Sequence, residues 1–415
     1  MINRVAITGI GMVTAAGLNV ADTWKKVLAG ETAIKKIARI DTTNFKAKLA
    51  AEIPPEFNPD LYVESPKDTR RLDRFTQYSL AAVDEAVKLS GLDFVSGNLD
   101  KTRCGVIYGS GIGGIGTLED EVNKLRDKGP SRVSPIFIPM LISNITCGHL
   151  SIKYGLEGTG FCPVTACSTG THAIGEAARA IRHGYADIMI AGGADAAVTP
   201  VSIAGFQNMN ALCESDDPAT GLLPFDRRRA GFVMGEGAGA VILENYDNAV
   251  KRGAVILGEV AGYAANFDAN HITQPDPSGK GAANAIKQAA ADAGINLGDI
   301  GYINAHGTGT KINDKVETAA IKSVFGEAAY KIPVSSTKGV TGHMLGAAGA
   351  VEAIFALLAL KEGILPPTAN LYEPDPELDL DYIPLKAREQ KAEYAVSTSL
   401  GFGSTNGVLI LKKGQ

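Results

Sequence analysis

Cys167 is a candidate nucleophile, because small residues surround it and a helix is predicted after it. Apolar residues recur at helical spacing from His172 to about His183, which predicts a helix there. Cys167 would then lie on a turn at a helix N-terminus, where unpaired N–H groups and the positive end of the helix dipole favour the thiolate. A free cysteine is more often a small buried residue without reactivity, so the assignment needs further groups.

Two histidines have the surroundings of functional residues. His306 follows a strand predicted at residues 301–305, His343 follows a short strand predicted at residues 334–336, and both lie in glycine-rich loops. Binding residues concentrate in such loops, although a single histidine is equally often a buried residue bonded to the backbone. A cysteine near histidine is typical of acyl transfer. The sequence has no Cys-x-x-Cys and no His-x-x-x-His pair, so no metal is expected.

A repeated pattern indicates how these three residues would meet. Cys167 and His343 each have a threonine two residues before, a glycine three residues after and a Glu-Ala pair from nine residues after. We therefore expect a duplicated α/β unit, with residues 1–250 carrying Cys167 and residues 251–415 carrying His306 and His343. A pseudo-twofold axis would set the matched helices side by side and bring the sulfur and both imidazoles together.

Composition limits the class of protein. The chain has 415 residues, a net charge of −5 and 45% hydrophobic residues, which favours a globular protein with a large core and gives no reason to expect nucleic acid. No run of 18 apolar residues exists, so no membrane span is expected. Five cysteines without framework spacing favour a reducing compartment, and we expect a cytoplasmic protein. Gly9-Ile10-Gly11 lacks the third glycine of a dinucleotide-binding turn.

Several motifs in combination carry a family resemblance. The chain resembles the type II β-ketoacyl-acyl carrier protein synthases, condensing enzymes of fatty acid synthesis, over about residues 4–412. The motifs are Thr165-Ala166-Cys167-Ser168, Asn304-Ala305-His306-Gly307-Thr308, Ser336-Thr337-Lys338-Gly339-Val340-Thr341-Gly342-His343, Gly346-Ala347-Ala348-Gly349, Gly401-Phe402-Gly403 and Gly231-Phe232-Val233-Met234-Gly235-Glu236-Gly237. The resemblance implies the thiolase fold, a duplicated αβαβα sandwich of five layers.

The resemblance also implies a ping-pong acyltransferase reaction without a cofactor. Cys167 takes an acyl group from an acyl carrier protein, and malonyl carrier protein then loses carbon dioxide and attacks the thioester. The backbone N–H groups of Cys167 and Phe402 would form an oxyanion hole, and His306 and His343 would donate hydrogen bonds as enolate charge develops. Lys338 would set the local field and orient His343. Phe402 would also gate the acyl pocket.

Substrate-binding roles follow from the same resemblance. Thr308 and Thr310 would contact the phosphopantetheine arm, while Leu400 and Phe232 fall at substrate-binding positions. Tyr108 stands where other members carry a smaller residue at the end of the acyl pocket. We therefore expect Tyr108 to narrow that pocket and to disfavour long primers.

Carrier proteins of this pathway are acidic, so a basic surface should steer them to the enzyme. The candidate docking residues are Lys67, Arg70, Arg71 and Arg132. The resemblance also implies a homodimer.

Three further positions depart from the family pattern: Gly309 replaces a usual serine, Lys311 a common proline and Ser404 a usual glycine. We expect Gly309 to loosen its loop and Ser404 to stiffen the gate. Gly309 is also typical of polyketide condensing subunits, which remain an alternative. A thiolase is disfavoured because no cysteine follows Cys213 to act as a second base. A non-catalytic chain-length factor is disfavoured because such subunits lack the nucleophile.

Overall fold

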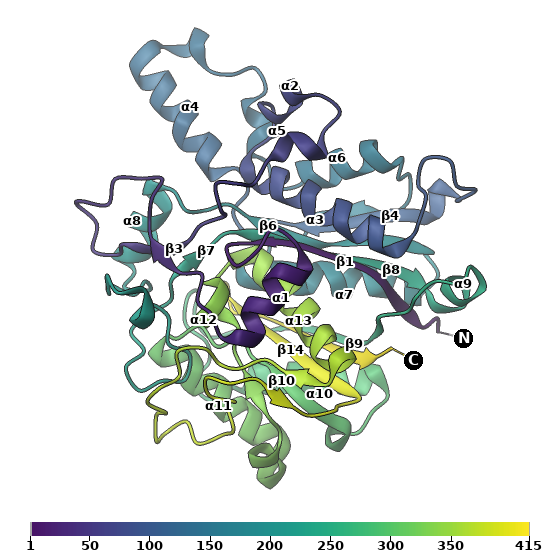
Figure 1. The fold of residues 1–415 in the computed structure, drawn as a ribbon, viewed down its shortest axis with the longest axis vertical. Coiled ribbons are helices and arrows are strands. Elements are labelled where there is room, and N and C mark those ends of the chain that lie inside the picture. The colour runs from purple at the N-terminus through teal and green to yellow at the C-terminus, as the bar shows by residue number, and fades with distance from the viewer. Residues whose placement is uncertain (1, 415) are drawn as a thin grey trace.

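The computed structural model describes residues 2–414, which form one ten-stranded mixed sheet flanked by helices (Figure 1). The strands of its first half, in spatial order from the centre, are β1 (Val5–Thr14), β8 (Gly237–Asn245), β6 (Ile188–Asp195), β4 (Cys104–Gly109) and β5 (Gly160–Phe161). Those of its second half are β9 (Gly258–Phe267), β15 (Thr405–Lys413), β14 (Tyr394–Gly401), β10 (Ile300–Asn304) and β11 (Val334–Ser335).

The two halves of the sheet repeat one pairing pattern. From the centre outward, each half has two antiparallel pairings followed by two parallel ones. The halves join where β1 pairs with β9, with Ala6 opposite Glu259 and Ile7 opposite Gly258. The same order and direction of strands on both sides of this junction is the expected duplication.

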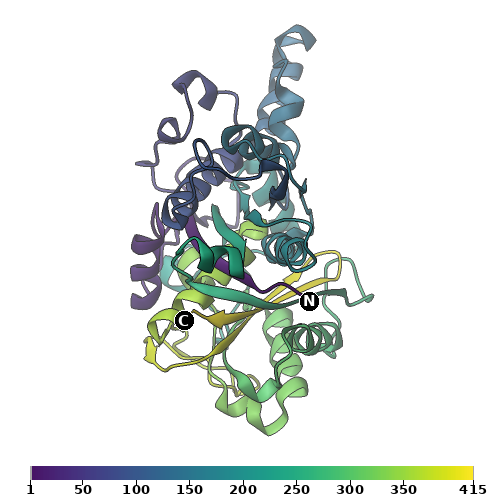
Figure 2. The same ribbon diagram turned by 90° about the vertical axis from the view of Figure 1, so that its right-hand side faces the viewer.

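The helices complete the layers. They are α1 (Val20–Ala29), α2 (Pro66–Thr69), α3 (Arg74–Ser90), α4 (Ile115–Lys128), α5 (Phe137–Leu141), α6 (Ile145–Tyr154), α7 (Thr169–Arg182), α8 (Pro200–Asn208), α9 (Tyr246–Lys251), α10 (Lys280–Ala293), α11 (Lys311–Phe325), α12 (Lys338–Thr341) and α13 (Ala348–Glu362). Helix α3 packs on β1 and β8, α10 packs on β9 and β15, and α7 and α13 pack against each other between the halves (Figures 1 and 2). This arrangement is the five-layered thiolase-like fold.

Short strands outside the large sheet complete the fold. They are β2 (Lys35–Lys36), β3 (Leu49–Ala51) and β7 (Met234–Gly235) in one small sheet, and β12 (Ile364–Leu365) and β13 (Arg388–Glu389) in another. Gly91 and Gly294 take the left-handed conformation at the C-termini of α3 and α10, which precede β4 and β10. Among residues 2–414, no helix has the length and apolar content needed to cross a membrane.

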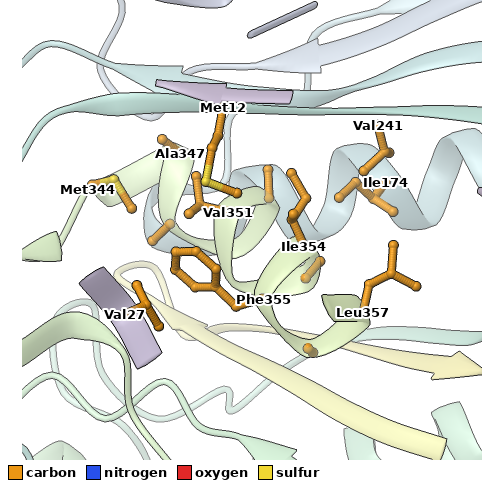
Figure 3. Packing of buried hydrophobic residues seen from close by; sticks show 14 of the residues in the cluster. Met12, Val27, Ile174, Val241, Met344, Ala347, Val351, Ile354, Phe355 and Leu357 are labelled. Atoms are coloured by element: carbon orange, nitrogen blue, oxygen red, sulfur yellow. The ribbon is translucent and has the colours of Figure 1, made fainter. Parts of the chain in front are cut away.

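Close packing of α7 against α13 depends on glycine. A Cβ atom on Gly170 would lie 2.6 Å from the backbone nitrogen of Ala350, and one on Gly349 would lie 2.1 Å from Thr171 Oγ1. Helix α13 is buried from Ala348 to Leu360, so its apolar composition on every side fits its central place. Figure 3 shows Ile354, Phe355 and Leu357 of this helix among residues of both halves.

The match between the two central helices differs from the expected one. Each helix follows a short 3₁₀ turn, η4 (Ala166–Ser168) before α7 and η8 (Leu345–Ala347) before α13. Both turns begin with a residue at positive φ, 50° at Ala166 and 49° at Leu345. Cys167 therefore corresponds to Gly346, and the expected equivalence with His343 is wrong. A short shared string suggested that register, whereas the backbone turn that starts each helix determines it.

Candidate active site

Residues from both halves line a single cavity of about 620 Å³. Sequence-predicted residues in its wall are Cys167, His306, His343, Thr308, Thr310, Leu400, Phe402 and Phe232. Lys338 lies behind the wall and is fully buried. The fold thus brings together at one cavity most of the residues that the sequence singled out, although they come from segments far apart in the chain.

Cys167 lies against His343 at this cavity. The turn η4 ends where α7 begins, and it places Cys167 Sγ 3.1 Å from His343 Nε2. The rings of His306 and His343 are edge to face with centroids 5.3 Å apart, and Phe232 packs edge to face on His343 at 5.1 Å. A sulfur within hydrogen-bond reach of an imidazole, beside a second imidazole, is the arrangement of a nucleophile with proton-transfer groups.

Lys338 orients His306 rather than His343, which corrects the expectation from the sequence. Its ammonium group lies 3.4 Å from His306 Nδ1 and donates to the His306 carbonyl at 2.6 Å. It also forms a fully buried ion pair with Glu352. An ammonium group only donates, so His306 Nδ1 accepts, and the ring proton resides on Nε2.

The loop after β10 is fixed by its backbone. Glu317 of α11 accepts hydrogen bonds from the backbone nitrogens of His306 at 2.7 Å and Gly307 at 2.8 Å. Thr398 of β14 donates to the same carboxylate at 2.7 Å. Sequence reasoning missed Glu317 and Glu352 as supports of the site. A buried position on an otherwise apolar helix was the available signal for Glu352.

Burial controls the charge states around the sulfur. Desolvation, with a smaller effect of the Lys338 charge, lowers the pKa of both His306 and His343 well below the usual value, so both rings are neutral near pH 7. Burial also raises the pKa of Cys167 to about 12, against the lowering effects of Lys338 and of the Phe402 N–H group. The expected stabilisation of the thiolate at a helix N-terminus is therefore outweighed, and the resting sulfur is a thiol.

Strands β10 and β14 and helix α13 each carry one buried side-chain oxygen atom that has no hydrogen-bond partner among residues 2–414. They are Asn304 Oδ1, Glu352 Oε2 and Ser397 Oγ. Oxygen atoms of this kind can bind a water molecule or serve as ligands of a hard cation. Within the same described range, no three His, Cys, Asp or Glu side chains gather in the way that a transition-metal site requires.

The loop of residues 401–404 lies beside the sulfur at the cavity wall. The Phe402 N–H group hydrogen-bonds toward Cys167, and Phe402 itself lines the cavity. Gly403 N donates to the Ile272 carbonyl at 2.6 Å, and Ser404 Oγ donates to the His271 carbonyl at 2.7 Å. Ser404 has a φ of 63°, in the region that favours glycine. Its hydroxyl thus ties this loop to the neighbouring segment around residue 271.

Gly309 lies at the mouth of the cavity and is restrained by contacts with Asp314 and Leu222. It has a φ of 71°, its N–H group donates to Asp314 Oδ1 at 3.2 Å, and a Cβ there would lie 3.3 Å from Leu222 Cδ2. The neighbouring hydroxyls of Thr308 and Thr310 are 3.0 Å apart. These contacts restrain the loop, against the loosening expected from glycine, and they leave both threonines facing the cavity.

Tyr108 lies outside the cavity wall. Its side chain is fully buried in the core of the first half, and its hydroxyl donates to the Gly193 carbonyl at 3.2 Å. The residues that line the cavity near Cys167 include Ile112 and Leu345, which sequence reasoning missed. Strand β4 alternates its side chains between two faces, and Tyr108 points away from the nucleophile into the outer layer. Ile112 follows in the glycine-rich loop, four residues further along.

The candidate docking residues are exposed and lie outside the cavity wall. Lys67, Arg70 and Arg71 lie in or just after α2, and Arg132 ends the 3₁₀ turn after α4. Arg71 lies 3.7 Å from Asp68. Helices α2, α4 and α5 occupy one end of the molecule (Figure 1), and the four residues belong to α2 or to the segments directly after α2 and α4.

Comparison with known proteins places this geometry in a family. The family model described as "Beta-ketoacyl synthase, N-terminal domain" matches residues 2–249, and "Beta-ketoacyl synthase, C-terminal domain" matches residues 257–372. Among curated proteins, the 3-oxoacyl-[acyl-carrier-protein] synthase 2 of Staphylococcus aureus is 48% identical over 99% of this chain and 98% of its own length. The protein of that name from Coxiella burnetii is 45% identical over the same shares.

Solved structures agree with the sequence relatives. A β-ketoacyl synthase from Burkholderia phymatum has a TM-score of 0.91 and 34% identity, with both chains fully covered. A ketosynthase solved with its type II polyketide acyl carrier protein has a TM-score of 0.92 and 31% identity, also over both full chains. The chain that sets Cys167 against two neutral imidazoles is therefore a member of the β-ketoacyl synthase family.

Proposed function

We propose that this enzyme is a 3-oxoacyl-acyl carrier protein synthase of type II, which elongates a fatty acyl chain by two carbons in the cytoplasm. The observation that carries the proposal is the contact of Cys167 with His343 beside His306, in a cavity of acyl-chain size. Residues 1–250 would be the half that carries the nucleophile, and residues 251–415 the half that carries both histidines.

The first half-reaction loads the enzyme. Cys167 Sγ attacks the thioester carbon of an acyl carrier protein, and the thiol proton passes to His343 Nε2 at 3.1 Å. The N–H groups of Cys167 and Phe402 stabilise the oxyanion. The carrier thiol leaves and takes up the proton, so the acyl group resides on Cys167 and His343 is neutral again.

The second half-reaction forms the carbon–carbon bond. A malonyl thioester binds with its thioester oxygen at the Nε2–H groups of His306 and His343. For this step the neutral ring of His343 carries its proton on Nε2, the opposite tautomer to the one that accepts the thiol proton during loading. The bond to the carboxylate breaks, carbon dioxide leaves, and its electron pair becomes an enolate that the two N–H groups stabilise. The enolate carbon attacks the acyl carbon, the bond from that carbon to Cys167 breaks, and the released thiolate takes a proton from solvent. Neutral histidines suit this role because each ring keeps one N–H group that can donate a hydrogen bond.

The cavity mouth would bind the phosphopantetheine arm. Thr308 and Thr310 present hydroxyls there, and both line the cavity. Lys311 also lies at the mouth, and its ammonium group has no ion-pair partner within residues 2–414. A phosphodiester on the arm is the complementary charge. Phe232 and Leu400 would face the acyl chain, and Phe402 would gate it.

Acyl carrier protein and a second copy of this chain are the proposed partners. The exposed cations Lys67, Arg70, Arg71 and Arg132 would steer an acidic carrier protein. Strand β5 lies at an edge of the large sheet and exposes 47% of Phe161, and Val164 beyond it is 56% exposed. An unpaired apolar edge of this kind favours pairing with another copy.

A polyketide condensing subunit is a second candidate. It is favoured by Gly309 and by the polyketide ketosynthases among the similar structures. The two candidates differ in product: a fatty acid synthase component releases a singly extended 3-oxoacyl chain for reduction, whereas a polyketide subunit extends the same chain repeatedly without reduction.

One assay tests the proposal. The protein is incubated with acyl carrier protein thioesters of increasing chain length and then with malonyl carrier protein. Mass spectrometry should find one acyl adduct on the peptide that contains Cys167, and it should find a 3-oxoacyl product longer by two carbons after malonyl addition. Absence of the adduct would refute the proposal, and repeated unreduced extension would favour the polyketide candidate.

A further inference from the structure

Asp195, at the end of β6, is a buried carboxylate that the mechanism above does not use. It is fully buried, and no lysine or arginine within residues 2–414 forms an ion pair with it. Its partners are all donors: Ser110 Oγ at 2.7 Å, Gly111 N at 3.1 Å, Ile112 N at 3.2 Å and Gly346 N at 2.6 Å. A carboxylate that only accepts hydrogen bonds is ionised, so a negative charge is held here by dipoles alone.

The four donors come from two segments that lie on either side of the nucleophile turn. The loop after β4 supplies Ser110, Gly111 and Ile112, and the turn η8 of the other half supplies Gly346. A Cβ atom on Gly346 would lie 2.4 Å from Gly111 N, and one on Gly111 would lie 3.2 Å from the carbonyl of Ala166. The loop, η8 and the turn of Cys167 are thus packed in direct contact around one carboxylate.

Two of these contacts bear on the acyl cavity. Ile112 lines the cavity and binds Asp195 through its own N–H group, while Leu345 lines it and directly precedes Gly346. The carboxylate therefore fixes the separation of two apolar side chains beside Cys167. Burial raises the pKa of Asp195 to about 6, which leaves it charged at neutral pH.

Asp195 also acts on Cys167 through space. The charged groups that face the sulfur are Lys338 of α12, Glu352 of α13 and Asp195 of β6, beside the neutral rings of His306 and His343. Of these, Asp195 and Glu352 disfavour the thiolate and Lys338 favours it. Because Glu352 is ion-paired with Lys338, Asp195 is the anion without a cation partner.

We propose that Asp195 is a positioning residue that holds Ile112 and Leu345 at a fixed separation beside Cys167 and adds an unpaired negative charge near the sulfur. Loss of its charge should then raise thiolate formation, while loss of its hydrogen bonds should alter the width of the acyl cavity. The second consequence deepens the proposed function and rests on it, whereas the first holds for any use of Cys167.

The test compares Asp195→Asn with Asp73→Asn as a matched control. Asp73 is also a buried carboxylate that accepts hydrogen bonds, from Phe75 N and from Thr117, and none of these residues lines the cavity. Both variants lose a buried charge and hydrogen bonds, so both should lose comparable thermal stability. Only Asp195→Asn should change the reactivity of Cys167.

Two measurements decide the proposal. The rate of iodoacetamide alkylation of Cys167 is followed between about pH 6 and pH 10 by fragment-ion masses that distinguish it from Cys162 on the same tryptic peptide. Asp195→Asn should shift this profile toward acid by roughly one pH unit. The ratio of kcat/KM for long over short acyl primers should change by roughly threefold or more. If Asp195→Asn gave the same alkylation profile or the same primer ratio as Asp73→Asn, the proposal would be overturned.

Two further outcomes, an unfolded Asp195→Asn variant and an inactive wild-type enzyme, also have a defined interpretation. If Asp195→Asn does not fold, Ser110→Ala removes one of the donors and must still change the primer ratio, or the proposal fails. If wild-type enzyme condenses no primer at all, the proposed function is refuted, and the alkylation profile alone then judges the effect of Asp195 on the sulfur.

Discussion

The turns before α7 and before α13 have the same backbone and different chemistry. Each is a 3₁₀ turn that begins at positive φ, at Ala166 and at Leu345, and each leads into a central helix. The first presents Cys167 at the position where the second has Gly346, whose N–H group binds Asp195. The comparison teaches that the duplicated scaffold supplies matched positions, and that reactive and supporting roles are divided between them.

The halves also differ in what surrounds their strand-end loops. In the second half, a buried network of Lys338, Glu352 and Glu317 fixes His306 and its loop. In the first half, the loop after β4 is held by Asp195 and carries the apolar side chain of Ile112. In the proposed reaction, the second half would provide the groups that handle protons and enolate charge, and the first half would provide the nucleophile and part of the acyl cavity wall.

The largest effect should come from the nucleophile. Cys167→Ala should abolish the acyl adduct and reduce condensation by on the order of 10⁴-fold or more, because no other group can hold the acyl chain. Thermal unfolding should change little, since Cys167 is only partly buried and alanine is smaller. Intact-protein mass after incubation with acyl carrier protein thioester measures the adduct. An adduct of equal stoichiometry in Cys167→Ala would contradict the assignment.

The two histidines should separate the half-reactions. His306→Ala should retain loading of Cys167 and lose condensation by roughly 10²- to 10⁴-fold, because its Nε2–H group acts on the malonyl oxygen. His343→Ala should slow both steps, since only His343 lies 3.1 Å from the sulfur. Single-turnover loading, followed separately from product formation, measures the difference. If His306→Ala and His343→Ala loaded Cys167 at equal rates, the contact of His343 with the sulfur would have no specific role in loading.

Lys338 should matter for stability as well as for rate. Lys338→Met leaves Glu352 buried without its cation, and breaking such a pair costs about 3–5 kcal/mol of unfolding free energy. The double variant Lys338→Met/Glu352→Gln should recover part of that stability without recovering condensation, because His306 Nδ1 has still lost its donor. Denaturant unfolding and condensation assays on the three proteins test this. Recovery of both properties together would assign Lys338 a purely structural role.

The pH dependence of alkylation should show that Cys167 rests as a thiol. With a pKa of about 12, the thiolate fraction of Cys167 rises about tenfold for each pH unit near neutrality. Iodoacetamide alkylation of Cys167 should therefore increase steadily to about pH 10 without a plateau. Cys162, which is also partly buried, is an internal reference on the same tryptic peptide, and fragment-ion masses separate the two alkylation sites. A plateau near neutral pH would show that the free enzyme holds a thiolate.

The smallest effect is expected at the proposed docking surface. Charge reversal in Arg70→Glu should raise KM for the carrier protein severalfold and leave kcat unchanged, because the side chain is exposed and outside the cavity. The same variant should respond less to added salt than the wild type. Lys386→Glu, an exposed cation of the second half, serves as the matched control. Equal KM values in both variants would remove Arg70 from the docking surface.

The sequence by itself predicted the duplicated α/β fold and singled out Cys167, His306 and His343, which the structure brings together at one cavity. Short motifs with glycine-rich turns carry this information because they report backbone geometry directly, as at Cys167 and His306. It did not determine the register of the duplication. A short sequence match aligned Cys167 with His343, whereas the 3₁₀ turn that starts each central helix aligns Cys167 with Gly346.

Only the tertiary structure decided which residues support the site. Lys338 contacts His306 instead of His343, Tyr108 points into the core, and Ile112 takes the place in the cavity wall. It also decided the charge of the sulfur, since the desolvation that opposes the thiolate depends on every layer packed around Cys167. Contacts and burial arise between segments far apart in the chain, and no local pattern encodes them.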